Sequence, residues 1–269
     1  MTGTAGVGSS GAGAKGSGGV AGTSGGGRAG TSGAAGAEAT GCHWLHDTTN
    51  DTWSFDTPAP ANTIVLFDGT SIDQWHMQGM PGVPISWQLV AGGAMQVVTS
   101  GTGKAVQVQS NMAFNDVCLH VEYLTAPYPA NTTDVQKRGN SGVYLRSAYE
   151  MQILDTHDLP PLIDGCGAVY KVSAPLVVAC YMYSVWNTYE IEFKASVWDN
   201  STPPRKIKDA VFVQVALNGK LVQRNVDLNL AGGSTEAGIP DSAGPQPIGL
   251  QDHLDPDEFR NIWVTIPQY

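Results

Sequence analysis

After Asn62 the chain contains a series of short segments in which apolar and polar residues alternate. Successive residues of a β-strand point to opposite faces of a sheet, so this alternation predicts strands with one apolar and one polar face. Helical periodicity is confined to single turns such as residues 71–75. The expected strands are 64–67, a hairpin at 87–98, 117–124, 142–146, 150–154, 188–194, 211–217 and 261–266.

Turn residues separate these segments, most clearly at Asn218-Gly219, a pair that favours the positive φ angles of a tight hairpin. Many short strands with frequent turns predict an all-β fold, either a sandwich or a barrel.

The first 41 residues differ sharply in composition from the rest of the chain. They are almost wholly Gly, Ala, Ser and Thr, and their only charged residues are Lys15, Arg28 and Glu38. Such a segment buries too little apolar area to offset the entropy of ordering it, so residues 1–41 are expected to be a disordered linker. Aromatic residues reappear at 42–61, which predicts a short ordered lead-in before a domain at 62–269.

Charge and hydropathy exclude several classes of partner. The 269-residue chain has a net charge of −10 and no basic stripe, which argues against nucleic acid because phosphate binding needs clustered Lys and Arg. No run of 18 apolar residues exists, so no membrane span is predicted. The sequence gives no indication of the oligomeric state.

A Gly/Ala/Ser/Thr spacer ahead of a compact domain is typical of exported proteins held away from a surface, including lipid-anchored ones. The protein is therefore expected to be secreted, periplasmic or on the cell surface. The residues after Met1 form neither the basic nor the apolar region of a signal peptide, so a different natural N-terminus or an intracellular location are the two alternatives.

The four cysteines lack the C-x-x-C spacing of a zinc site or redox pair. Cys166 and Cys180 flank a short irregular stretch and would bridge it in an oxidising compartment. Four unpaired thiols are the alternative.

Seven sequence blocks, taken in order, resemble the 3-keto-disaccharide hydrolase domain family. The blocks are LFDGTSIDQW (66–75), GNSGVYLRS (139–147), YEMQILD (149–155), WNTYEIEF (186–193), LNGK (217–220), IGLQDH (248–253) and FRNIWV (259–264). The resemblance implies a concanavalin-like jelly roll of two sheets and action on 3-keto-glycosides, which are sugars oxidised at C3. Some family members are described as hydrolases and others as eliminases or hydratases.

The sequence departs from the family pattern in two places. Leu254-Asp255-Pro256 follows the IGLQDH block where the family usually has a glycine, and the region from Cys166 to Cys180 carries extra residues. Both places are predicted loops, so the departures bear on substrate range more than on fold.

Alternation also predicts which polar side chains share a face. Tyr144 and Arg146 point away from the apolar face of their strand, as do Glu150 and Gln152 in the next one. If the two strands are neighbours, these four side chains lie together. A face rich in Glu, Gln, His, Arg and Tyr suits sugar hydroxyls, whereas the alternative is an ordinary sheet face in water.

Several residues on these faces are candidates for chemistry on a 3-keto-sugar. Glu150 is a candidate base for the C2 proton or acid for the leaving oxygen. Arg146 would stabilise the enolate together with Tyr144 or Tyr170, or it would only form an ion pair with Glu150. His157 is a second candidate acid/base that Asp155 would orient.

The remaining candidates concern binding. The substrate-binding candidates are Tyr144, Gln152, Glu122, Tyr170, Asn140, Gln251, His253 and Trp186. A divalent metal is an open alternative with Glu122, His157 and His253 as candidate ligands, and no other cofactor is indicated.

The sequence thus predicts an enzyme that cleaves the glycosidic bond of 3-keto-glycosides by hydrolysis or elimination. A carbohydrate-binding module without catalysis, or an adhesive surface protein, are the alternatives.

Overall fold

The computed structural model describes Cys42, Ala59 and residues 63–98, 105–236 and 238–269. The predicted linker, and the lead-in apart from Cys42 and Ala59, lie outside the described residues. The described part contains fifteen strands, one 3-10 turn at Val135–Lys137 and no α-helix, and no helix in it is long and apolar enough to cross a membrane. The strands are β1 Ile64–Phe67, β2 Trp75–Met77, β3 Gln88–Val90, β4 Ala94–Gln96, β5 Val106–Phe114, β6 Val117–Leu124, β7 Ser141–Leu145, β8 Tyr149–Ile153, β9 Asn187–Lys194, β10 Val197–Trp198, β11 Lys206–Lys208, β12 Val211–Leu217, β13 Lys220–Asp227, β14 Gln246–Asp252 and β15 Glu258–Thr265.

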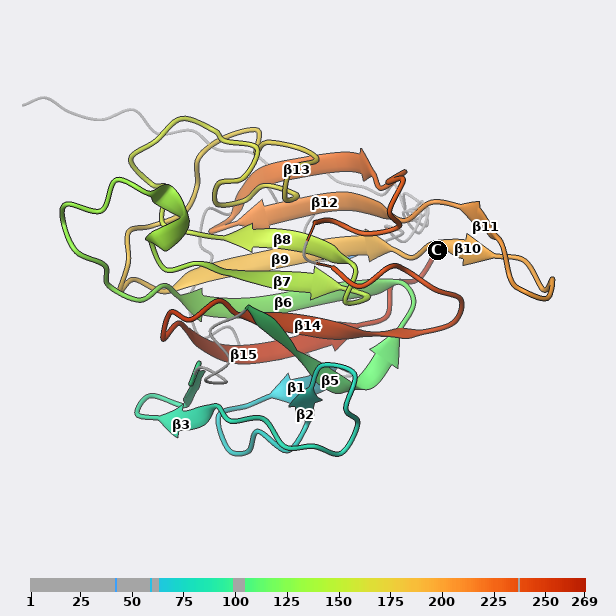
Figure 1. Cartoon of the computed structure of the whole chain (residues 1–269), viewed down its shortest axis with the longest axis horizontal. Helices are drawn as coiled ribbons and strands as arrows, with labels where there is room; N and C mark the ends of the chain where they lie inside the picture. The colour runs from blue at the N-terminus through green and yellow to red at the C-terminus, as the bar shows by residue number, and fades with distance from the viewer. Residues whose placement is uncertain (1–41, 43–58, 60–62, 99–104, 237) are drawn as a thin grey trace, which may run out of the picture. The chain divides into compact units, whose positions relative to one another are not determined.

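These strands form two antiparallel sheets that overlie one another (Figure 1). The larger sheet has the order β13-β12-β9-β6-β15-β4-β3, and β1 also pairs with β15. The smaller sheet has the order β2-β5-β14-β7-β8, and β10 and β11 form a separate hairpin. The predicted jelly-roll-like sandwich is therefore confirmed. The long strands β5 and β13 were not among the expected strands, and residues 71–75 form a single hydrogen-bonded turn, in which Trp75 N donates to Ile72 O, that leads into β2.

The core lies between the sheets and contains the apolar half of each alternating strand. Val121, Tyr189 and Ile191 enter it from the larger sheet, and Val143 and Met151 enter it from the smaller one, all fully buried. Burial of each such side chain stabilises the fold by roughly 1.5–3 kcal/mol before the entropy of ordering is counted. The opposite, outer face of each sheet therefore receives the polar residues.

One row of outer-face residues crosses all five strands of the smaller sheet. Glu150 lies opposite Tyr144, and Tyr144 lies opposite Gly249. Gly249 in turn pairs with Gln109, which pairs with His76. Side chains from different parts of the sequence thus stand side by side on this face.

Two long segments pack against the β8 side of this face. The segment between β8 and β9 contributes hydrogen bonds from Gly167 N to Gln152 O and from Tyr170 N to Glu150 O. The segment between β13 and β14 docks through Thr235 N, which donates to Ala148 O. As a result, the side chains of Glu150 and Gln152 are buried although they point away from the core.

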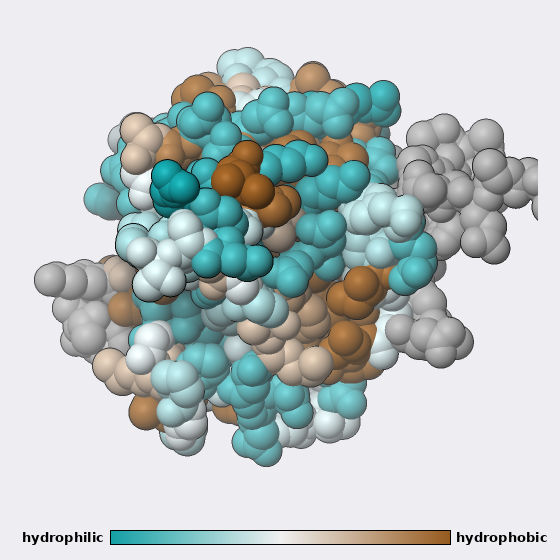
Figure 2. Space-filling model, turned by 90° about the vertical axis from the view of Figure 1, so that its right-hand side faces the viewer, coloured by the Kyte–Doolittle hydropathy of each residue, from teal (hydrophilic) through white to brown (hydrophobic). Residues whose placement is uncertain are grey.

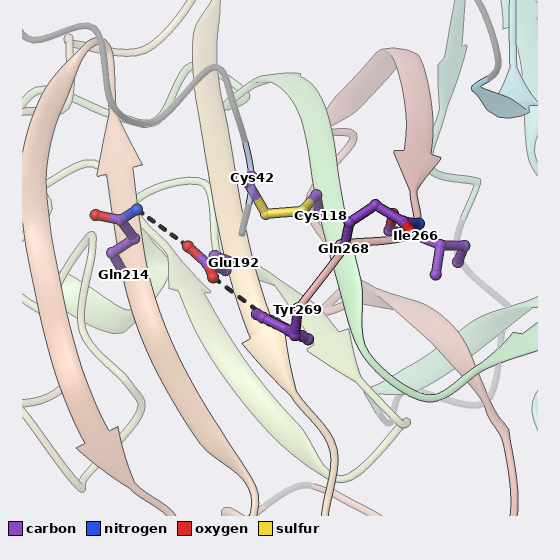
Figure 3. The surroundings of a disulfide bond; sticks show 7 residues. All are labelled: Cys42, Cys118, Glu192, Gln214, Ile266, Gln268 and Tyr269. Carbon is purple, nitrogen blue, oxygen red and sulfur yellow. Dashed lines mark hydrogen bonds between the residues drawn. A yellow bond between two sulfur atoms is a disulfide. The ribbon is translucent and has the colours of Figure 1, made fainter. Parts of the chain in front are cut away.

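A disulfide joins Cys42 to Cys118, 76 residues apart, on the outer face of the larger sheet. Figure 3 shows it near Glu192 and the C-terminal Tyr269. Cys166 and Cys180 are buried free thiols. The bridge between Cys166 and Cys180 that the sequence suggested is absent, and so is a state in which all four thiols are unpaired.

Candidate active site

A small cavity of about 170 Å³ lies on the outer face of the smaller sheet. β8 contributes Glu150 and Gln152, and β14 contributes Gln251. This volume is below that of sites for drug-sized ligands and suits a small ring. The full lining is Ala105, Gln136, Asn140, Glu150, Gln152, Tyr170, Glu236, Gln251 and His253. Six residues that the sequence predicted thus come together, although their roles stay predictions.

The carboxyl group of Glu150 is the central group of this cavity. Its side chain rests over Gly142, where an added Cβ would lie 2.5 Å from Glu150 Oε1. Burial raises the pKa of Glu150 to about 8, against the opposing effect of a hydrogen bond with Tyr144, and the charge of Glu236 adds to the increase. Glu150 therefore holds its proton at neutral pH.

Three buried side-chain oxygens around the cavity have no partner in the described structure: Glu150 Oε2, Gln152 Oε1 and Gln251 Oε1. The amide nitrogens are occupied, because Gln251 Nε2 donates to Tyr144 Oη at 2.8 Å and Gln152 Nε2 donates to Asp164 O at 3.4 Å. A buried polar atom without a partner costs about 1–3 kcal/mol. Such atoms mark places where the hydroxyl groups of a ligand would hydrogen-bond.

Tyr144 connects Glu150 to the side-chain amide of Gln251. Its hydroxyl group hydrogen-bonds the Glu150 carboxyl and accepts from Gln251. Burial, with the Glu150 charge second, raises the pKa of Tyr144, so the phenol stays protonated as a donor. Tyr144 therefore orients Glu150 from beneath the cavity.

The mouth of the cavity carries a charged pair that the sequence reasoning missed. Lys171 Nζ lies 2.5 Å from Glu236 Oε2 and 5.1 Å from the centre of the Tyr170 ring. Gln136, in the 3-10 turn, is the other polar lining residue that was not predicted. Glu236 and Gln136 lie outside the alternating strands, so no periodic signal pointed to either.

Arg146 does not lie beside Glu150 as predicted. It has a φ of 59° and follows β7, so the alternation ends before it. Arg146 Nε donates to Asp241 Oδ1 at 2.7 Å, and Nη2 donates to the carbonyl groups of Ser242 and Gly244. The expected contact with Glu150, catalytic or ionic, is therefore wrong, and Arg146 lines a separate cavity of about 570 Å³.

Glu122 and Trp186 lie away from the cavity, against the larger sheet. Glu122 accepts hydrogen bonds from Arg260 Nε at 2.7 Å and from Asn261 Nδ2 at 2.8 Å. The Arg260 guanidinium lies 4.1 Å from the centre of the Trp186 ring. Both predicted sugar ligands therefore have structural partners of their own.

The predicted His157–Asp155 pair forms, but it does not line the cavity. His157 Nδ1 lies 2.6 Å from Asp155 Oδ1, and Asp155 Oδ2 accepts from Tyr128 Oη and Tyr183 N. The three predicted metal ligands, Glu122, His157 and His253, do not meet. Among the described residues, no group of three His, Cys, Asp or Glu side chains is placed to hold a metal ion.

A larger cavity, about 940 Å³, contains none of the predicted site residues. It lies beside the β10–β11 hairpin and is lined partly by Val197, Trp198 and Ile266. Figure 2 shows small apolar groups among hydrophilic ones on the side of the molecule that carries this hairpin. Size alone therefore does not locate the chemistry.

Comparison with known proteins places the chain in a family. The chain belongs to the 3-keto-alpha-glucoside-1,2-lyase-like domain family, whose model matches residues 62–265. The resemblance seen in the sequence blocks is thereby confirmed, and with it a carbohydrate-related function. No curated protein matches the chain.

Solved structures from Parabacteroides distasonis agree with this assignment. One, provisionally named a glycosyl hydrolase, is 31% identical, with a TM-score of 0.64, and the match covers 78% of this chain and 85% of that one. A second with the same provisional name is 15% identical, with a TM-score of 0.53 over 76% and 93% of the two chains, and shows the fold alone.

Proposed function

We propose that this protein is an enzyme that cleaves the glycosidic bond of 3-keto-glycosides by elimination across C1 and C2, with Glu150 as the general acid. The observation that carries the proposal is a buried carboxyl group that keeps its proton near neutral pH and lines a cavity rich in unpaired amide oxygens. The family match supports the substrate class.

The ketone at C3 makes the C2 proton acidic. Removal of that proton gives an enolate, and collapse of the enolate breaks the C1–O bond and leaves an enone. The leaving oxygen needs a proton, which a carboxylic acid with a pKa near 8 supplies at neutral pH. Water that later adds to the enone turns elimination into net hydrolysis.

The other cavity residues bind and orient in this proposal. The unpaired oxygens of Gln152 and Gln251 accept hydrogen bonds from sugar hydroxyl groups. Tyr144 is occupied by Glu150 and Gln251, so Tyr170 is the phenol left to donate to the developing enolate. Arg146, bound to Asp241, takes no part.

The test uses two 3-keto-α-glucosides, a disaccharide and a 4-nitrophenyl glycoside, each beside its unoxidised form. The wild type should release the aglycone from the keto forms alone. Glu150→Gln should lower kcat/KM on the keto-disaccharide about 10²–10⁴-fold, and far less on the nitrophenyl glycoside, whose leaving group needs no acid. Parallel reactions with EDTA show whether a metal is required.

The pH profile gives an independent check of the acid role. Glu150 must be protonated to act as an acid, so kcat/KM on the keto-disaccharide should fall as the pH rises through about 8. A rise through the same pH would assign Glu150 as a base. Binding of unoxidised glycosides without consumption of either keto-glycoside would overturn the proposal in favour of a binding module.

We also propose that the protein works in a secreted, periplasmic or cell-surface location. The Cys42–Cys118 disulfide supports this, because disulfides persist mainly in oxidising compartments. Thiol labelling of the protein from its native source, with and without reduction, tests it. Complete labelling without reduction would count against export.

A further inference from the structure

The proposed elimination needs a base for the C2 proton, and the structure narrows the choice. His157 lies outside the cavity, and Glu150 holds the proton that the leaving oxygen needs. The titratable groups that remain in the lining are Tyr170, Glu236 and His253. Of these, only Glu236 is a carboxylate, and its charge acts directly on Glu150.

Glu236 is held at the cavity from the segment between β13 and β14. The preceding residue, Thr235, accepts a hydrogen bond at its Oγ1 from Glu150 N at 3.1 Å. The same hydroxyl group donates to Ala148 O at 3.1 Å, and Thr235 N also donates to Ala148 O. Glu150 and Glu236 are thus fixed relative to one another through a single residue.

The two carboxyl groups stand in opposite environments. The Glu150 side chain is buried, whereas that of Glu236 is 62% exposed and paired with Lys171. Burial favours the protonated form of the Glu150 carboxyl group. A buried carboxyl group and an exposed, ion-paired one thus line the same cavity, which is the arrangement that acid/base catalysis requires.

We propose that Glu236 is the catalytic base that removes the C2 proton, working with Glu150 as the acid in the same cavity. This assignment rests on the proposed function. Lys171 keeps Glu236 at the mouth of the cavity until substrate binds. Exposed ion pairs contribute little to stability, so the carboxylate leaves Lys171 at little cost.

A Glu236 oxygen takes the C2 proton, the C2–H electron pair forms a C2=C3 bond, and the C3 carbonyl becomes an enolate oxygen. The carbonyl then re-forms, the electron pair forms C1=C2, and the C1–O bond breaks as Glu150 protonates the leaving oxygen. One alcohol and one enone result, and exchange with water returns the proton from Glu236 to Glu150.

Exchange of the C2 proton with solvent distinguishes loss of the base from loss of the acid. The Glu150→Gln variant should stall after proton removal, so the 3-keto-disaccharide should exchange its C2 proton in D2O, as followed by NMR, without being cleaved. Adding Glu236→Gln to this variant should slow the exchange at least about 10²-fold. Glu236→Gln alone should slow release from the 4-nitrophenyl glycoside by a similar factor, because an activated leaving group cannot replace the base.

Matched variants complete the experiment. Glu258→Gln, on β15 and outside the cavity, should leave exchange and release unchanged. Glu236→Gln should melt at the wild-type temperature because its side chain is exposed. Exchange that survives Glu236→Gln, or that stops with His253→Gln instead, would overturn the assignment. A wild-type protein that cleaves neither keto-glycoside would instead overturn the proposed function.

Discussion

The outer faces of the two sheets are both polar and both buried, yet they differ in how their polar atoms are paired. On the larger sheet, His120 bonds Glu190 at 2.6 Å, and Glu122 accepts from Arg260 and Asn261. On the smaller sheet, the buried oxygens of Glu150, Gln152 and Gln251 that border the cavity lack partners. On the larger sheet, Glu190 Oε2 is unpaired, but the other carboxyl oxygens named here are bonded within the sheet, whereas the unpaired oxygens of the smaller sheet border a cavity that is open to a ligand.

The charges of the two layers follow from this pairing. Burial alone would lower the pKa of His120, but Glu190 and Glu122 outweigh it and raise the pKa to about 9. Burial opposes ionisation of Glu122, but hydrogen bonds from His120, Asn261 and Arg260 lower its pKa to about 2. Both groups stay charged at neutral pH, whereas Glu150 stays neutral. A buried polar face thus indicates a site when its atoms lack protein partners.

The largest expected effect is on how the free energy of unfolding depends on pH, because Glu150 in the smaller sheet is held neutral. The pKa of Glu150 is 4.5 in the unfolded chain and about 8 in the folded one, so between these values only the unfolded chain ionises it, and the free energy of unfolding falls as the pH rises. Glu150→Gln lacks this loss. In urea titrations, the free energy of unfolding of this variant should therefore rise relative to that of the wild type by as much as about 4 kcal/mol as the pH goes from 5 to 9. A pH-independent difference would show that Glu150 is not held neutral.

The polar layer of the larger sheet should respond in the opposite way to loss of a partner. Arg260→Met leaves Glu122 buried with one charge partner fewer, and we expect the free energy of unfolding to fall by about 3 kcal/mol. Activity per folded molecule on a 3-keto-glycoside should stay within about twofold. Lys208→Met, an exposed lysine on β11, is the control and should change stability by less than about 0.5 kcal/mol. Lost activity without lost stability would give this layer a functional role.

A smaller effect is expected from Tyr144→Phe in the polar layer of the smaller sheet. The change removes the acceptor of Gln251 Nε2 and should lower the free energy of unfolding by about 1–2 kcal/mol. It also removes the hydrogen bond that opposes the high pKa of Glu150, so the falling limb of the pH profile should move to higher pH. An unmoved limb would show that Tyr144 only packs beneath the site.

Alternation predicted the sandwich and most of the polar lining because strand geometry fixes which side chains share a face. It placed Glu150 and Gln152 together, as the structure does. It could not assign Glu122 to a sheet, because strand order is a long-range property. It also failed at Arg146, where a positive φ ends the strand.

The rest of the site depends on segments without a repeating pattern. Gln136 and Glu236 reach the cavity from a 3-10 turn and an irregular segment, and their positions depend on hydrogen bonds such as those of Thr235. The pairing of Cys42 with Cys118 could not be predicted from sequence spacing either, because 76 residues separate the two cysteines. Contacts set only by the folded chain thus decide both the mouth of the cavity and the disulfide.

The disulfide also decides where mechanical load enters the molecule. Any tension carried by the chain before Cys42 passes through the sulfur bridge into β6, an interior strand flanked by β9 and β15. Pulling there strains the larger sheet, while the smaller sheet and its cavity lie on the far side of the core, outside the load path.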